Sequence, residues 1–288
     1  MKKFLDSPHP YALITILCWA PAFVLTHLLA PWLSPASLGF LRYGIASVIL
    51  IIILAVRRMK LPELKDLPLF ALAAACGFSV YMLIFNHGVA MVNSATSSVI
   101  IAMAPVFTDV MASILFHEQL KKAQWAALLI QFGGVLILLL SGSSFSFNEG
   151  ALWLLLCALM FGTYNILQRQ LTKKYPPFLT SAVCVILGAI ELIWAAPAAI
   201  RQFGAAPAEM KLCTIFLGVF SSALAYVTWA VAFSKAEKTS EVANYMFVTP
   251  FFATLLGFAL NSEIPTPSTI IGGAMILMGA IVFNKNKK

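Results

Sequence analysis

Three ionisable side chains stand inside long apolar runs of this sequence. Asp109 lies one helical turn beyond Pro105 and Glu191 lies near the middle of a later run. Arg42 is the one cation placed in this way. If these runs cross a membrane, each charge costs about 2.5–3.5 kcal/mol at the bilayer centre on insertion scales, so each must face protein or water, or be neutralised. Asp109 is a candidate for binding substrate or a proton, with a structural role as the alternative, and Arg42 is a candidate ion-pair partner for either carboxylate.

Aromatic residues offer a second kind of chemistry, the binding of a small solute. Trp and Tyr usually gather where a membrane meets water, and those placed deeper need a hydrogen-bond partner. Any one of them could simply pack between helices. As a set they suit a small amphipathic solute such as an amino acid or, with Asp109, an organic cation held by cation–π contact. The predicted substrate-binding residues are Trp19, Tyr81, Asn86, His87, Asp109, Tyr164, Tyr226, Trp229, Asn244 and Tyr245.

The sequence offers little for catalysis. No HExxH pair suggests a zinc site, no GxxxxGK[ST] loop is present for a nucleotide, and no GxSxG elbow carries a nucleophile. The five cysteines form no CxxC motif and no Cys/His cluster. We therefore expect no catalytic residue, metal or cofactor. A membrane-embedded enzyme would need such a cluster and is disfavoured, whereas a non-transporting receptor subunit stays as an alternative.

Composition indicates where these residues lie. Of the 288 residues, 61% are hydrophobic and only 10% are charged, whereas soluble domains carry about 25% charged residues. The apolar runs are long and continuous, as membrane-spanning helices require. The sequence predicts an all-α membrane protein with ten transmembrane helices, over residues 10–30, 37–56, 67–90, 94–116, 123–141, 150–169, 178–200, 211–234, 240–260 and 267–284.

The basic residues indicate the orientation of these helices. With a cytoplasmic N-terminus, sixteen of the 19 Lys and Arg fall in inner segments, and only Arg201 and Lys211 fall in outer loops. Cytoplasmic loops are enriched in Lys and Arg, so we predict a multi-pass protein of the cell inner (plasma) membrane with both termini in the cytoplasm. This distribution explains the net charge of +8 without a nucleic-acid partner. The expected partners are the lipid bilayer and a small-molecule substrate; the oligomeric state stays open, and a monomer would suffice.

The chain contains an internal repeat. A shift of 145 residues superimposes a proline, a glutamate and a glycine with the same spacing: Pro105, Glu118 and Gly134 on Pro250, Glu263 and Gly279. The repeat predicts two halves of five helices, residues 1–143 and 144–288. An odd number of helices in each half makes the two copies inverted in the membrane, as in secondary transporters whose related halves enclose a central site.

The repeated motif, P-x12-E with a glycine sixteen residues after the glutamate, resembles the EamA-type modules of the drug/metabolite transporter superfamily. The family also tends to have a glycine nine residues after the glutamate, which Gly272 matches and Ala127 does not. The resemblance covers nearly the whole chain. It implies two inverted five-helix repeats around a central cavity lined mainly by helices 1, 3, 4, 6, 8 and 9.

The same resemblance implies a function. It points to a transporter of small organic solutes that works by alternating access, with export of amino acids or related metabolites as the leading expectation. The alternative is an importer or exporter of an organic cation such as a quaternary amine.

Prolines within apolar runs are expected to bend helices. A proline in a helix interior removes a backbone hydrogen bond. We therefore expect Pro21, Pro105 and Pro250 to be kink or gating positions beside the cavity, with a fixed requirement of shape as the alternative. Glu118 and Glu263 lie near the membrane boundary, where contacts at helix ends are favoured over proton coupling.

Overall fold

The computed structural model describes residues 6–116, 121–140, 148–236 and 242–285, which form helices with no β-strand among them. Glu118 lies outside these residues. Seven helical segments are long and apolar enough to cross a membrane, and a helix pair bent by 49° gives an eighth. Two shorter apolar helices, Tyr245–Asn261 and Pro267–Phe283, occupy the positions of the last two predicted spans. The all-helical membrane class is confirmed with seven or eight spans, and ten spans stay a prediction.

The helices follow the apolar runs because lipid offers no hydrogen-bond partner to an open backbone. In chain order they are α2 (His9–Leu29), α3 (Pro35–Val56), α4 (Leu67–Gly77), α5 (Ser79–Met91), α6 (Ser94–Ile101), α7 (Ala104–Phe116), α8 (Lys122–Leu139), α9 (Glu149–Leu171), α10 (Pro177–Glu191), α11 (Ala196–Ala205), α12 (Ala208–Phe216), α13 (Ala225–Lys235), α15 (Thr249–Asn261) and α16 (Pro267–Lys285). Three short 3-10 turns, η1 (Leu64–Asp66), η3 (Ile193–Ala195) and η5 (Asn244–Val248), and one π-helix, η4 (Leu217–Leu224), connect or extend them.

Several of the spans are interrupted along their length. α4 and α5 meet at Phe78, whose backbone angles (φ −134°, ψ −78°) are not helical. α6 and α7 are separated by Ala102 and Met103, and η4 joins α12 to α13. Interruptions and π-helical turns leave backbone carbonyls and amides for partners on other helices.

The repeated prolines lie just after interruptions and not in helix interiors. Pro105 is the second residue of α7, and Pro250 is the second residue of α15, which follows η5. In the first turn of a helix the missing proline N–H removes no intrahelical hydrogen bond. Pro21 differs, because α2 continues through it. The interior kink expected at Pro105 and Pro250 is therefore a helix start that follows a break.

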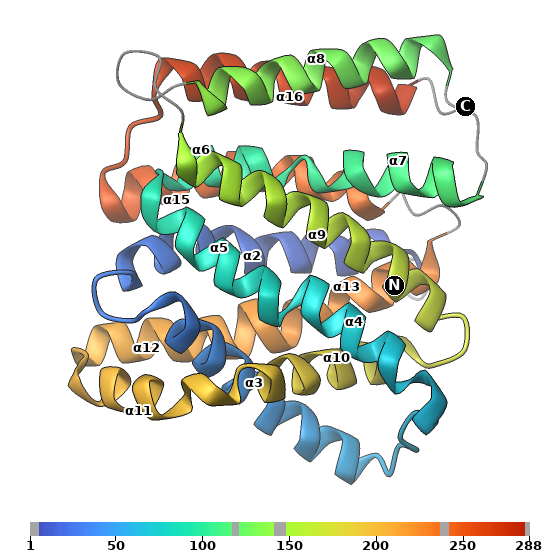
Figure 1. Cartoon of the computed structure of the whole chain (residues 1–288), viewed down its shortest axis with the longest axis vertical. Helices are drawn as coiled ribbons and strands as arrows, with labels where there is room; N and C mark the ends of the chain where they lie inside the picture. The colour runs from blue at the N-terminus through green and yellow to red at the C-terminus, as the bar shows by residue number, and fades with distance from the viewer. Residues whose placement is uncertain (1–5, 117–120, 141–147, 237–241, 286–288) are drawn as a thin grey trace.

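The helices form a bundle in which one pair stands apart. α8 and α16 lie side by side at one end of the molecule, at the top of Figure 1. α2, α5 and α9 run through the middle of the bundle, and α3, α10, α11 and α12 lie toward the other end (Figure 1). Small residues allow the α8–α16 contact, because a β-carbon on Gly279 would lie 2.8 Å from the Ala127 carbonyl oxygen.

Helices at the same place in the two predicted repeats make matching contacts with the other repeat. α2 packs against α13 and α15, and its counterpart α9 packs against α5 and α7. α3 packs against η4 and α12, and its counterpart α10 packs against α4. The pairs α3–α10 and α8–α16 join helices that occupy the same place in the two predicted repeats. The centre of the bundle is therefore enclosed by both halves.

A polar cluster ties a loop of the first half to a loop of the second. Lys174 Nζ lies 2.9 Å from Glu63 Oε1 and 2.5 Å from Asp66 Oδ2. The Tyr175 hydroxyl also donates a hydrogen bond to Asp66. Hydrogen bonds from Lys65 and Lys174 lower the pKa of the Glu63 carboxyl below its ordinary value. Hydrogen bonds to Asp66 and Glu63 raise the pKa of the Lys174 ammonium group, so Glu63 and Lys174 are both charged at neutral pH.

Candidate functional site

A pocket lies at the centre of the bundle, between helices of both halves. It is lined by Trp19, Ala22 and Phe23 of α2, Arg42 of α3, Tyr81, Met82 and Phe85 of α5, Ser98 and Ile101 of α6, Ala102, Phe161 of α9, Tyr226 of α13, Met246 of η5 and Thr249 of α15. Its cavity volume is about 40 Å³. The pocket is therefore narrow in this conformation, and an organic solute needs the helices to move apart.

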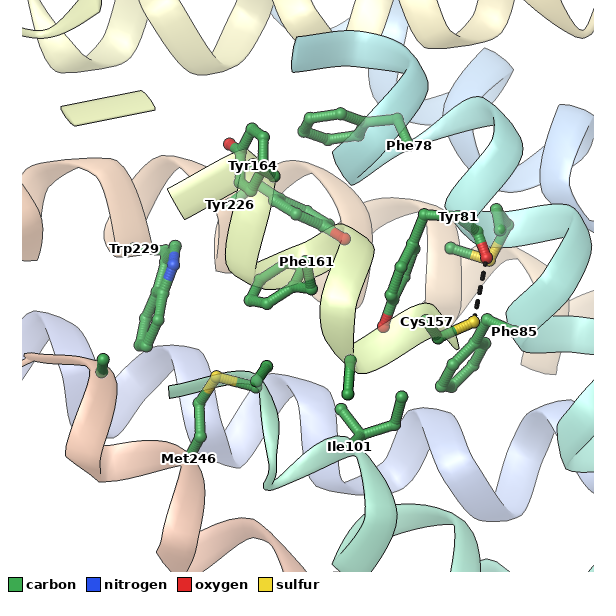
Figure 2. Packing of buried hydrophobic residues seen from close by; sticks show 14 of the residues in the cluster. Phe78, Tyr81, Phe85, Ile101, Cys157, Phe161, Tyr164, Tyr226, Trp229 and Met246 are labelled. Atoms are coloured by element: carbon green, nitrogen blue, oxygen red, sulfur yellow. Dashed lines mark hydrogen bonds between the residues drawn. The ribbon is translucent and has the colours of Figure 1, made fainter. Parts of the chain in front are cut away.

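Aromatic rings form much of the pocket wall. The ring centroid of Trp19 lies 5.2 Å from that of Tyr226 and 5.5 Å from that of Phe161. Tyr81 lies 5.5 Å from Phe161 on the other side. Figure 2 shows Phe161 between Tyr81 and Trp229, with Met246 across from them. Three predicted residues, Trp19, Tyr81 and Tyr226, thus meet in one wall.

Two further predicted aromatics stand one layer behind this wall. Tyr164 contacts Phe161 with a centroid distance of 5.5 Å, and Trp229 contacts Trp19 at 5.0 Å. Phe161, which joins these rings, is absent from the predicted set because its side chain has no polar group. Its position in the sequence could have indicated its role, because Phe161 precedes Tyr164 by three residues and so lies on the same face of the helix.

Hydrogen bonds hold the buried polar tips of Trp229 and Tyr226. Trp229 Nε1 donates to Asn165 Oδ1 at 3.3 Å, and Asn165 Nδ2 donates to Thr108 Oγ1 at 3.2 Å. The Tyr226 hydroxyl donates at 3.2 Å to the carbonyl of Gly77, the last residue of α4 before the break at Phe78. Buried tryptophan and tyrosine tips need such partners. The rings are therefore fixed in orientation by groups that the sequence alone did not single out.

Trp19 is held by the π-helical turn. Trp19 Nε1 donates to the carbonyl oxygen of Ser221 in η4 at 3.1 Å, and the Ser221 hydroxyl donates to the carbonyl oxygen of Cys18 at 2.6 Å. A π-helical turn shifts the carbonyls out of the usual α-helical register. These two hydrogen bonds join α2 of the first half to η4 of the second. Trp19 itself lines the pocket.

Arg42 contributes the one charged side chain of the pocket wall. It is 2% exposed. Its Nε donates to Ser222 Oγ and its Nη1 to Met82 Sδ, both at 3.4 Å. Within the described part of the chain, no Asp or Glu oxygen lies within 4.0 Å of it, and the ion pairs found there join Lys65 or Lys174 to Glu63 or Asp66. The expected pairing of Arg42 with Asp109 or Glu191 is not formed.

The interruptions in two spans contribute backbone and polar groups to the same pocket. Ala102 lies in the break between α6 and α7, and Thr249 opens α15 after η5. Thr249 is 5% exposed, and its hydroxyl has no hydrogen-bond partner among the described residues. The pocket thus joins a guanidinium without a carboxylate partner and a hydroxyl without a hydrogen-bond partner, both among the described residues, to a wall of aromatic rings.

Two of the predicted polar residues lie away from the pocket. His87 is exposed and meets Trp153 edge to face, with ring centroids 5.6 Å apart. Asn86 is buried, and its Nδ2 donates to the carbonyl oxygen of Pro35 at 2.8 Å. Both therefore make contacts near helix ends.

The remaining predicted residues are also separate from the pocket lining. The Tyr245 hydroxyl hydrogen-bonds with Nδ1 of His9 at 3.0 Å. The side chain of Asn244 lies outside the described part of the structure. Asp109 is buried on α7, at 8% exposure, and is not among the lining residues.

The other two carboxylates of interest each accept a hydrogen bond from the first residue of a helix. The Ser79 hydroxyl donates to Glu191, which ends α10 at the 49° bend. Glu263 accepts hydrogen bonds from the Ser94 N–H at 2.7 Å, the Ser94 hydroxyl at 3.0 Å and Asn261 Nδ2 at 2.8 Å. Across residues 6–116, 121–140, 148–236 and 242–285, no group of three His, Cys, Asp or Glu is arranged to hold a metal ion.

Similar proteins agree with this architecture. The model of the EamA-like transporter family matches the chain twice, at residues 7–140 and 148–285. A probable terminal-alkyne amino-acid exporter of Streptantibioticus cattleyicolor is 28% identical over 272 residues, which cover 94% of this chain and 91% of that protein. The pseudopaline exporter CntI of Pseudomonas aeruginosa is 25% identical over 263 residues, which cover 89% of this chain and 88% of that protein. A solved crystal structure has the same fold over 98% of both chains, with a TM-score of 0.68 at 20% identity. The chain therefore belongs to the EamA-like transporter family, within the drug/metabolite transporter superfamily.

Proposed function

We propose that this protein moves small organic solutes across the inner (plasma) membrane by alternating access, and that it exports amino acids or related metabolites. One observation carries the proposal: an aromatic pocket, enclosed by helices of both halves, that holds a guanidinium with no carboxylate partner and a hydroxyl with no hydrogen-bond partner among the described residues. Pockets for small molecules are mostly apolar, with a few placed polar groups that orient the ligand. The names of two similar proteins, an amino-acid exporter and a pseudopaline exporter, support export of this kind of solute.

The mechanism rests on two related five-helix halves. The family model matches each half separately, and the helix contacts keep their pattern when the halves are exchanged. Both observations support ten spans in two repeats, and the distribution of Lys and Arg supports inverted copies with cytoplasmic termini. Rocking of one half against the other would open the narrow pocket to each side in turn.

Transport is tested with purified full-length protein in liposomes. A library of amino acids and related metabolites is first screened for thermal stabilisation, since a ligand that binds only the folded state raises the melting temperature. Solutes that stabilise the protein are then followed by counterflow, with protein-free liposomes as the control. Folded protein that moves none of the library solutes would exclude the proposal.

Orientation is tested in a cysteine-free variant with single cysteines at predicted loop positions. Lys60→Cys is expected to resist a membrane-impermeant thiol reagent in intact cells, whereas Arg201→Cys is expected to react. The reverse pattern would contradict cytoplasmic termini. Labelling at both positions would contradict the predicted number of spans between them.

The pocket supports an organic cation less well. Aromatic rings attract cations, but the guanidinium of Arg42 stands in the same wall and would repel one. The interaction expected between Asp109 and a bound cation lacks support as well, since Asp109 is not a lining residue.

A further inference from the structure

We propose that Arg42 binds the carboxylate of the transported solute, so that the substrates are small carboxylates with an apolar body. This inference rests on the proposed transport function and names the substrate class of the same pocket.

The Arg42 charge has no carboxylate partner among the described residues. The side chain lies in the pocket wall at 2% exposure, without a carboxylate within 4.0 Å among the described residues. A buried charge is costly unless it is paired. Ionisable residues inside membrane segments therefore mark sites where a ligand, an ion or a partner completes the interaction.

The described residues use little of the hydrogen-bonding capacity of the Arg42 guanidinium. A guanidinium has five N–H donors and no acceptor. The described protein atoms take up one at Ser222 Oγ and one at Met82 Sδ. The contact to Ser222, at 3.4 Å, is long for a hydrogen bond, and a thioether sulfur is a weak acceptor. The planar fork of arginine matches a carboxylate, which can accept two parallel hydrogen bonds.

A hydroxyl and several aromatic rings share the pocket with the Arg42 charge. Thr249 adds a buried hydroxyl without a hydrogen-bond partner among the described residues, which can donate to the same anion or bind another polar group of the solute. Trp19, Phe23 and Phe85 line the same pocket. The surfaces of these rings can contact the apolar body of an organic solute. They cannot replace the hydrogen bonds that an inorganic anion makes with water. The combination selects an organic carboxylate.

The proposal is tested by binding of three probes that share a phenyl group. These are 3-phenylpropionate, L-phenylalanine and L-phenylalaninamide, of which the last lacks the carboxylate. On purified full-length protein, the two acids are expected to raise the melting temperature. The amide is expected to bind at least about 10-fold more weakly, because a charge-assisted hydrogen bond is lost.

Variants at position 42 assign the effect to this side chain. Arg42→Gln is expected to lower the affinity for 3-phenylpropionate by about 10-fold or more and to change that for the amide little. Arg42→Lys keeps the charge without the planar fork and is expected to lose less. Arg57→Gln removes a cation at the C-terminal end of the same helix, outside the pocket, and should bind like the wild type.

The outcomes separate this proposal from the transport function. Equal binding of acid and amide, or unchanged binding by folded Arg42→Gln, overturns the role of Arg42 while transport of the probes still supports a transporter. Failure of both acids to bind also overturns it, and the transport function fails only if the wider solute library yields nothing. Should Arg42→Gln not fold, the acid and amide probes on the wild type decide.

Discussion

Gly134 of α8 and Gly272 of α16 face each other so closely that neither position can carry a side chain without movement of the backbone. A β-carbon on Gly134 would lie 2.6 Å from the Gly272 carbonyl oxygen, and one on Gly272 would lie 2.8 Å from the Gly134 carbonyl oxygen. Gly279 stands in the same relation to Ala127. The small residues at 134 and 127 of α8 therefore pair with Gly272 and Gly279 of α16, and the missing β-carbon at Gly279 allows the close approach to the Ala127 carbonyl.

Gly134→Ala is expected to destabilise the α8–α16 pair by about 1–3 kcal/mol, because the added methyl group meets backbone and not a movable side chain. Gly133→Ala is the matched control, since its nearest neighbour is the flexible end of Met275 at 3.1 Å. Thermal unfolding of the two purified variants, compared with the wild type, gives the measurement. Equal melting temperatures for the two variants would contradict the close approach.

Trp19→Phe keeps a ring in the pocket wall but removes the donor to the Ser221 carbonyl. Loss of one buried hydrogen bond is expected to cost about 1 kcal/mol in stability. We expect a larger effect on transport, because Trp19 lines the pocket and joins the two halves. The counterflow rate and the melting temperature are both measured for Trp19→Phe and for the wild type.

Trp153→Phe controls for the loss of an indole elsewhere. Trp153 Nε1 donates to Glu149 Oε1 at an exposed position outside the pocket. If Trp153→Phe loses as much transport as Trp19→Phe does, the result would contradict a specific role of Trp19 in the pocket.

Glu263→Gln is expected to destabilise the protein by about 1 kcal/mol, because the carboxylate satisfies the N–H of Ser94 at the start of α6. Glu209→Gln, at an exposed position in the first turn of α12, is the control and is expected to change stability little. If Glu263 acts only as a cap, the pH dependence of transport is unchanged in the variant. A shifted pH profile in a variant of normal stability would instead indicate a role in coupling.

Lys174→Gln is expected to weaken the tie between the loops before α4 and before α10. Because the pKa of Glu63 is lowered from its ordinary value of 4.5, its contribution to stability is present above that pH and is lost as the pH falls through the lowered pKa. The raised pKa of Lys174 keeps its contribution fully present below the ordinary value of 10.5. The difference in melting temperature between wild type and variant should therefore be constant near neutral pH and vanish in acid.

Salt and a neighbouring lysine provide the controls for this cluster. The pairs are exposed, so high ionic strength should reduce the difference. Lys173→Gln removes an exposed lysine next to the cluster and should show no such pH dependence. A difference that persists in acid would mean that Lys174 acts through packing and not through its charge.

The sequence by itself determined the helical membrane class, the approximate span positions and the family. Long apolar runs can satisfy their backbone in lipid only as helices, and the spacing of Pro105 and Gly134 repeats at Pro250 and Gly279. These are local properties of the chain, or of a shift along it, and they need no knowledge of contacts.

Only the tertiary structure decided which of the candidate side chains meet. It brings Trp19, Tyr81 and Tyr226 into one wall, places His87 at an exposed position, and leaves Arg42 without a protein carboxylate among the described residues. The physical reason is that lipid and the protein interior are both apolar, so the periodicity of a membrane helix does not reveal which of its faces turns inward. In such a chain the inward face is chosen by helix packing, and the pocket follows from that choice.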